Sequence, residues 1–232
     1  MDATAGAGPP GWARAIILGG SALALLLIGA TVGLLIGRSE TPTQAVATPG
    51  PVDIGFSQDM SLHHRQAVEM GNLAYVRSDD TEISQIGFDI AATQQGQVGS
   101  MQGWLALWEA PGQAPGEVMS WMPHDGGSGD AHDSHGSMDH AMGAGDAVMP
   151  GMATSEEMRK LRSLSGEKFD VYFLQLMVRH HEGGVPMAEY AVEHAKVPAV
   201  RALARSILES QGAEIELMKK MLETRGAKPL PF

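Results

Sequence analysis

The sequence Phe56-Ser57-Gln58-Asp59-Met60-Ser61-Leu62-His63-His64 returns further along the chain as Phe173-Leu174-Gln175-Leu176-Met177-Val178-Arg179-His180-His181. The two stretches lie 117 residues apart, and the same offset pairs Met70 with Met187 and Gln94 with Gln211. Because the register is kept without a gap over about fifty residues, the sequence predicts two copies of one structural unit.

Apolar residues recur at helical spacing within each copy. Stripes of residues three or four apart, which form one face of a helix, run through 56–74, 83–105, 173–191 and 200–222. The sequence shows no alternating pattern typical of strands. It therefore predicts an all-α fold, an antiparallel four-helix bundle made from two repeated helical hairpins.

Cap-forming residues set the expected helix ends. Asp80 is placed to cap the second helix of the first hairpin, and Thr154 with Glu157 forms a capping box that predicts a short helix over about 155–163. Pro198 suits the first turn of the last helix. The expected divisions are a tail over 1–14, a transmembrane helix or long signal sequence over 15–37, a linker over 38–52, the first hairpin over 53–110, an unstructured insert over 111–153, the short helix and second hairpin over 154–226, and a tail over 227–232.

Residues 15–37 contain no charged side chain and are flanked by Arg14 and Arg38. A helix of this length crosses a hydrocarbon core of about 30 Å, so we favour an uncleaved anchor that holds the following domain outside the cytoplasm. The alternative is a secreted protein cleaved after Ala45-Val46-Ala47. Glycines spaced four apart (Gly29, Gly33 and Gly37) leave a homodimer open, although ordinary membrane-helix glycine is the favoured interpretation.

Composition limits the partners and the metal chemistry. The net charge of −11 argues against a nucleic-acid partner, which needs a basic surface. The chain has no cysteine but 15 methionines and 9 histidines among its 232 residues. Thioether and imidazole are therefore the soft or borderline donors available to a metal ion.

Each copy of the repeat carries the motif Met-x-x-His-His. Residues three and four apart are neighbours on a helix, so one sulfur and one imidazole can approach the same ion. Thioether with imidazole favours Cu(I) over Cu(II), zinc or a di-iron centre. We favour metal binding over a purely structural histidine cluster. The candidate ligands are Met60, His63, His64, Met177, His180 and His181, with Met70 and Met187 as weaker candidates because they lie seven residues beyond a histidine.

Two further groups of residues fit a metal-binding protein. Gln94 and Gln211 are polar positions on apolar stripes, and they serve either helix-to-helix hydrogen bonding or the orientation of an imidazole. The insert is rich in histidine and methionine, a composition typical of metal capture. Its candidate residues are His124, His132, His135, Met138, His140, Met142, Met149 and Met152.

Three stretches together resemble the bacterial family called domain of unknown function three hundred and five (DUF305): Asp59-Met60-x-x-His63-His64, Met149-Pro150-Gly151-Met152, and the second motif continued through Glu182-Gly183. The resemblance covers about residues 53–225. It implies a ferritin-like four-helix fold, an envelope location, copper binding in some members, and ligand roles for the methionines and histidines of the two motifs.

The sequence favours an extracytoplasmic protein that sequesters, buffers or hands on copper. The alternatives are a metal-dependent oxidoreductase and an interaction module with structural histidines. No acid–base pair or nucleophile arrangement is visible in the sequence, so we expect no catalytic residue. Since histidine must be neutral to bind metal, affinity is expected to fall below a pH of about 6.5.

Overall fold

The computed structural model describes residues 12, 19–20, 24–33, 47–123 and 147–231, and within these ranges the only regular elements are helices. The chain divides into two units, residues 1–46 and 47–232, which we treat separately. Residues 24–33 of the first unit are helical. In the described parts of the chain, no helix has both the length and the apolar character needed to cross a membrane. The span expected over 15–37 lies partly outside the described residues and stays a prediction.

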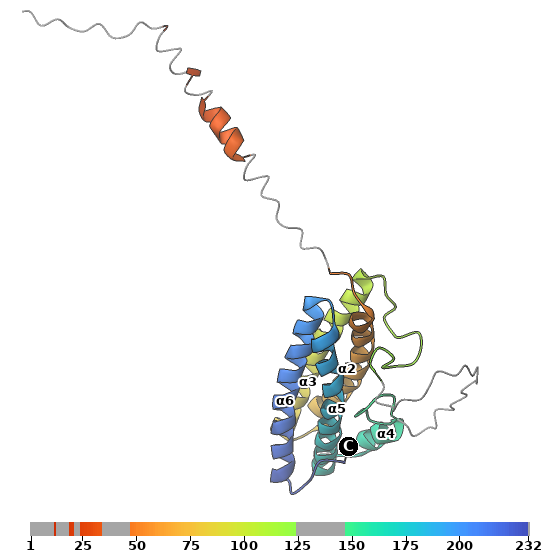
Figure 1. The fold of residues 1–232 in the computed structure, drawn as a ribbon. Coiled ribbons are helices and arrows are strands. Elements are labelled where there is room, and N and C mark those ends of the chain that lie inside the picture. The colour runs from red at the N-terminus through yellow and green to blue at the C-terminus, as the bar shows by residue number, and fades with distance from the viewer. Residues whose placement is uncertain (1–11, 13–18, 21–23, 34–46, 124–146, 232) are drawn as a thin grey trace, which may run out of the picture. The chain divides into compact units, whose positions relative to one another are not determined.

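The second unit contains four long helices and one short one (Figure 1). Their bounds are α2 Pro51–Arg77, α3 Thr81–Leu107, α4 Ser155–Ser163, α5 Gly166–His194 and α6 Pro198–Thr224. The predicted repeat is visible in these bounds, because α3 and α6 begin and end 117 residues apart. The predicted all-α class is confirmed for the described residues.

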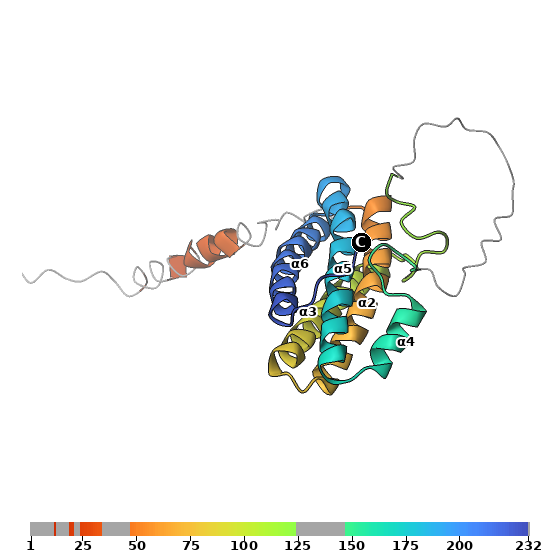
Figure 2. The same ribbon diagram turned by 90° about the horizontal axis from the view of Figure 1, so that it is seen from below.

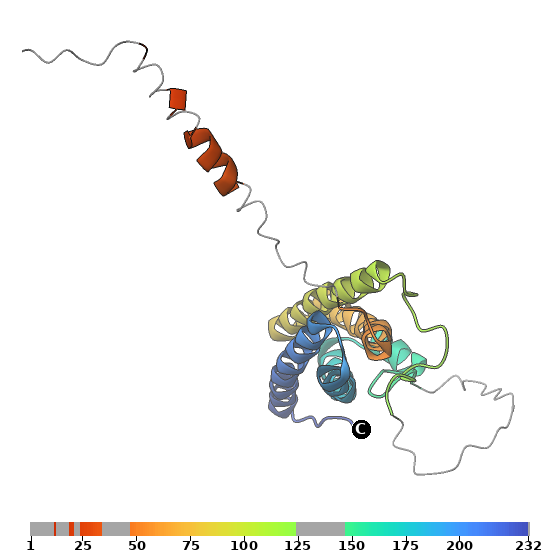
Figure 3. The ribbon, with the colours of Figure 1, turned by 45° about the horizontal axis from the view of Figure 1, so that its top comes forward.

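The long helices pack as two pairs, and the most extensive contact between the pairs joins α2 to α5. α2 packs along α3, α5 packs along α6, and the pairs are joined where α2 lies against α5. α4 lies against α5 on the side away from α6, as Figure 2 and Figure 3 show from two further directions. The contact between α2 and α5 therefore brings the two copies of the motif together.

Three predicted helix starts are confirmed. The carboxylate of Asp80 accepts a hydrogen bond from the backbone N–H of Glu82 at 2.9 Å. Thr154 and Glu157 form the reciprocal capping box at the start of α4. Pro198 lies in the first turn of α6, where its missing N–H costs nothing. Caps of this kind typically contribute about 1 kcal/mol each.

Two buried aspartates tie each hairpin to the turn of the other. Asp53 accepts hydrogen bonds from the backbone N–H groups of Lys196, at 3.2 Å, and Val197, at 2.8 Å, in the turn between α5 and α6. Its repeat equivalent, Asp170, accepts from Ser78 Oγ at 2.6 Å in the turn between α2 and α3. The repeat thus extends to the contacts between hairpins, which the sequence analysis did not foresee.

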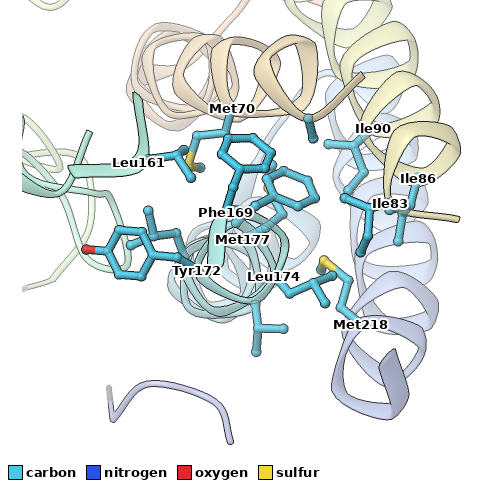
Figure 4. Close-up of a cluster of buried hydrophobic side chains, with 14 of the residues drawn as sticks. Met70, Ile83, Ile86, Ile90, Leu161, Phe169, Tyr172, Leu174, Met177 and Met218 are labelled. Atoms are coloured by element: carbon cyan, nitrogen blue, oxygen red, sulfur yellow. The ribbon is translucent and has the colours of Figure 1, made fainter. Parts of the chain in front are cut away.

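Two apolar clusters flank the motif histidines. The Phe173 cluster, drawn in Figure 4, takes residues of α2 that follow the histidines and residues of α5 that precede them, with Met70, Phe169 and Met177 among its members. The Phe56 cluster takes the opposite ends of the two helices. Fully burying each large side chain is worth roughly 1.5–3 kcal/mol. The histidines therefore lie along both helices between two separate hydrophobic cores.

The insert was predicted to be unstructured over 111–153, but both of its ends contact α2. At the first end, the carboxylate of Asp59 accepts hydrogen bonds from the backbone N–H of Met119, at 2.7 Å, and from Trp121 Nε1, at 2.8 Å. At the second end, the side-chain amide of Gln66 pairs with both backbone groups of Ala153. The ends 111–123 and 147–153 are thus fastened to α2, whereas 124–146 lie outside the described residues.

Candidate metal centre

The four motif histidines meet where α2 packs against α5. His63 and His64 come from α2, His180 and His181 come from α5, and the side chains of all four are fully buried. The ring centroids of His63 and His180 lie 3.9 Å apart, with the ring planes tilted by 40°. Four imidazoles from both copies of the repeat thus share one buried centre.

The backbone fixes the protonation of His63 and His180. His63 Nε2 lies 3.3 Å from the carbonyl oxygen of Pro150, and His180 Nε2 lies 3.1 Å from the carbonyl oxygen of His63. A carbonyl oxygen only accepts hydrogen bonds, so Nε2 is the nitrogen that carries the proton in each ring. In a neutral imidazole, Nδ1 then presents a free lone pair.

For His64 and His181, side-chain oxygens determine which ring nitrogen carries the proton. His64 Nε2 lies 2.8 Å from Gln97 Oε1, and His181 Nε2 lies 2.6 Å from Glu214 Oε2. Each partner is 33 residues beyond its histidine, on the second helix of the same hairpin. All four rings therefore direct a protonated Nε2 to an oxygen and leave Nδ1 as the unprotonated nitrogen.

The unprotonated nitrogens and two nearby amides have no hydrogen-bond partner. The Nδ1 atoms of all four histidines are buried and unpaired among the described residues, as are both amide atoms of Gln94 and Gln211. A buried polar group without a partner costs about 1–3 kcal/mol, and such groups are rare in folded proteins. The helix-to-helix bonding considered for the glutamines is therefore not observed among the described residues, and each buried lone pair is free to bind a cation.

Gly184 leaves space beside one of these donors. A Cβ at this position would lie 3.3 Å from Gln211 Oε1, 3.4 Å from His63 Cε1 and 3.7 Å from His63 Nδ1. The repeat-equivalent residue on α2 is Ala67, which carries the methyl group that Gly184 lacks. The space around His63 Nδ1 therefore depends on a glycine that has no counterpart in the first copy.

Burial keeps three of the four imidazoles uncharged. Desolvation, partly offset by the Pro150 carbonyl, lowers the pKa of His63 to about 4. Desolvation, with the nearby His63, lowers the pKa of His64 to about 3. Desolvation also holds the pKa of His180 well below its usual value, with further lowering from neighbouring histidines. These three imidazoles are neutral at pH 7, the state that metal binding requires.

The methionines of the two motifs lie on opposite sides of the histidines. Met60 belongs to the Phe56 cluster together with Met187, whereas Met177 belongs to the Phe173 cluster together with Met70. The weaker candidates Met70 and Met187 thus lie in the same cluster as the motif methionine of the other repeat. The structure groups thioethers across repeats rather than within one motif.

The Phe56 cluster gathers further methionines from the end of the insert. Met149 and Met152, 2% and 5% exposed, join Met60, Met101 and Met187 there. Between them, Gly151 has a φ of +78° and packs on the backbone of Gly183. The two methionines expected to capture metal in a free segment are instead part of the core beside His63.

The sequence model of the family described as "Domain of unknown function (DUF305)" matches residues 53–222. The chain belongs to the DUF305 family. This DUF305 protein is similar to the crystal structure of a putative secreted DUF305 protein from Streptomyces coelicolor, with 43% identity, a TM-score of 0.66, and coverage of 78% of this chain and 98% of that chain. No curated protein matches its sequence.

Two further solved structures share the fold of this DUF305 protein. A DUF305 fragment from Deinococcus radiodurans is 29% identical, with a TM-score of 0.58 and coverage of 76% of this chain and 98% of that chain. CopM in a Cu(II)-bound form is 24% identical, with a TM-score of 0.53 and coverage of 74% and 96%. At that identity the likeness to CopM concerns the fold alone.

Six of the ligands predicted for this DUF305 protein belong to the central part of the insert. His124, His132, His135, Met138, His140 and Met142 lie outside the described residues. Within the described ranges, no three side chains of the His, Cys, Asp or Glu type converge as a metal site.

The neighbours of the histidines that the sequence analysis missed are Gln97, Glu214, Pro150 and Gly184. For Gln97 and Glu214 a signal existed, since both stand 33 residues after the second histidine of a motif.

Proposed function

We propose that this protein binds copper, chiefly as Cu(I), at the buried centre between α2 and α5, and that it sequesters, buffers or hands on the ion outside the cytoplasm. The observation that carries the proposal is the set of four buried Nδ1 lone pairs that lack partners among the described residues. Their Nε2 hydrogen bonds orient all four rings, so little reorganisation is needed to present these lone pairs to a cation.

The chemistry of the surrounding donors supports a soft ion. Methionines flank the histidines on both sides, and thioether ligands favour Cu(I) over harder cations. Met60 and Met187 supply sulfur near one end of the centre, and Met70 and Met177 near the other. The burial of the centre excludes water, and the lowered pKa values of His63 and His64 remove competition from protons at neutral pH.

The family relationships support the same proposal. CopM, which shares the fold, has been solved in Cu(I)-bound, Cu(II)-bound and Ag-bound forms, and the related Streptomyces protein is described as secreted. We extend both properties to this chain as proposals. The proposal includes an antiparallel, ferritin-like four-helix bundle and a membrane anchor within 15–37, and it assigns the centre binding and release rather than catalysis.

Copper content of the purified full chain tests the proposal. Protein purified from copper-supplemented cells should contain copper. The double variant His63→Ala with His180→Ala should contain less, because it lacks the copper that is bound at the centre. His194→Ala is the matched control, because His194 is an exposed histidine on the same helix as His180. Equal copper content in the parent, the double variant and the control would refute binding at the centre.

A further inference from the structure

The two hairpins hold their second histidine in the same way but with different chemistry. His64 of the first hairpin donates to the neutral amide of Gln97, and His181 of the second donates to the carboxylate of Glu214. The two partners are themselves related by the 117-residue offset of the repeat. The second histidines of the two motifs are therefore held by equivalent positions of the repeat but by partners of different charge.

Glu214 is the carboxylate that faces the histidines from α6. Glu182 follows His181 directly in the sequence. Its carboxylate, however, forms an ion pair with Lys219, with Oε1 2.9 Å from Nζ. Glu214 Oε2, by contrast, lies 2.6 Å from His181 Nε2. One side of the buried centre thus has a negatively charged partner hydrogen-bonded to its imidazole, and the other side has only an amide dipole.

This difference bears directly on cation binding. An imidazole that donates its second N–H to a carboxylate is a stronger metal ligand, because the negative charge raises the electron density on the free nitrogen. A carboxylate also offsets the charge of a cation that has left water, which is costly in a buried site. Gln97 orients His64 equally well but provides neither effect.

We propose that Glu214 makes the His181 side of the centre take up the first ion, and that the His64 side, held by Gln97, fills second. This inference rests on the proposed copper-binding function and assigns an order to it. Glu214 is a positioning residue here, since it acts through His181 and not by touching the ion. The repeat thus supplies a stronger and a weaker half-site at equivalent positions of its two copies.

Ring-resolved nitrogen NMR of the full chain, labelled with ¹⁵N-histidine, tests the order. Cu(I) is added anaerobically in steps below one equivalent, and the Nδ1 signals of His181 and His64 are followed separately. In the parent protein the His181 signal should shift first.

Glu214→Gln should remove this order and weaken the first binding step about 10–100-fold. Gln can still accept from His181 Nε2–H, so the metal-free tautomer should stay unchanged and report an intact fold.

The reciprocal variant makes the test independent of any damage caused by Glu214→Gln. Gln97→Glu should give His64 a carboxylate partner and raise the Cu(I) affinity of the His64 side. The His64 and His181 signals should then shift together. The inference fails, while copper binding stands, if the rings respond in the same order in the parent and in both variants. If no motif histidine of the folded parent responds even to excess Cu(I), the proposed function itself fails.

Discussion

His180 donates its Nε2–H to the backbone carbonyl of His63, its own counterpart 117 residues earlier in the repeat. The two copies of the motif therefore meet at their first histidines, and the rings of these two histidines lie 3.9 Å apart. This contact places four imidazoles between two apolar clusters instead of in one continuous core. The properties of the centre follow from that burial.

The metal-free protein should lose stability on mild acidification. Burial lowers the pKa of His63 to about 4 and that of His64 to about 3, against an ordinary value of 6.5. Between pH 6.5 and 4 the unfolded chain gains protons that the folded chain does not, so stability falls as pH falls. The slope is on the order of 1 kcal/mol per pH unit for each histidine.

Urea unfolding of the metal-free protein at several pH values between 6.5 and 5 measures this slope. In that window the carboxylates with lowered pKa values, Asp80 and Glu157, contribute little, because even their ordinary pKa values lie below it. The exposed-residue variant His194→Ala should keep the same slope. A constant free energy of unfolding across the window would mean that the motif histidines are not held neutral by burial.

Copper binding at the centre should be less sensitive to pH than the sequence suggests. From a reference pKa of about 6.5, affinity would fall below that pH. With a pKa of about 4 for His63, proton competition begins only near pH 4. Cu(I) competition titrations at pH 7 and pH 5 should therefore give similar affinities for the part of the binding that the variant His63→Ala removes. A loss of about tenfold per pH unit below 6.5 would show that the imidazoles titrate normally.

The sequence was sufficient to predict the repeat and the helices that carry the motif histidines. Periodicity and caps define single helices, and the bounds of α3 and α6 confirm them. The repeat offset could also have paired His64–Gln97 with His181–Glu214, since both partners stand at the same distance along the chain. The equal spacing is visible in the sequence. It becomes informative only once the structure shows that Gln97 and Glu214 contact the histidines.

The grouping of methionines could not be predicted, because it depends on how α2 and α5 pack. An antiparallel contact brings residues before the motif on one helix opposite residues after it on the other, so Met60 joins Met187 and not Met177. Nor did composition show that Met149 and Met152 are buried, since a Gly-, Ser- and Asp-rich stretch has no periodicity to place them.

Asp53 should be a major source of stability in the packing of the two hairpins. Its buried carboxylate accepts hydrogen bonds from the backbone N–H groups of Lys196 and Val197 at the start of α6. Asp53→Ala would leave these donors without an acceptor, at a cost of about 3 kcal/mol in the free energy of unfolding. Asp89→Ala, at an exposed position, is the control and should change little. Equal unfolding free energies for the two variants would contradict this role.

The paired methionines should determine selectivity for a soft ion. Met60→Leu with Met187→Leu removes two thioethers from the Phe56 cluster and keeps the core volume, so stability should change by less than about 1.5 kcal/mol per site. Affinity for Cu(I) should fall much more than affinity for zinc, because only the softer ion gains from sulfur. Met158→Leu, in the other cluster, is the volume-matched control. Equal losses for both ions would argue against thioether ligands.

Gly184 offers a way to separate copper binding from folding. Gly184→Ala adds a methyl group 3.3 Å from Gln211 Oε1, so the Gln211 side chain must shift by a few tenths of an ångström, and places the same methyl group in contact with His63 Cε1 at 3.4 Å. The added methyl group also fills the space beside His63 Nδ1, 3.7 Å away, so Cu(I) affinity should fall. The same change raises helix propensity by about 1 kcal/mol, so the metal-free variant should unfold at no lower urea concentration than the parent.

Gly212→Ala is the matched control for this variant. Gly212 lies within α6, is exposed, and has no heavy atom among the described residues within 4 Å of the added methyl group. This control should gain the same helix propensity and keep the Cu(I) affinity of the parent. Chelator competition for Cu(I) and urea unfolding on the three proteins give both quantities. If Gly184→Ala binds Cu(I) as tightly as Gly212→Ala does, the space beside His63 is not part of the copper centre, and the ligands must be sought on the His180 and His181 side.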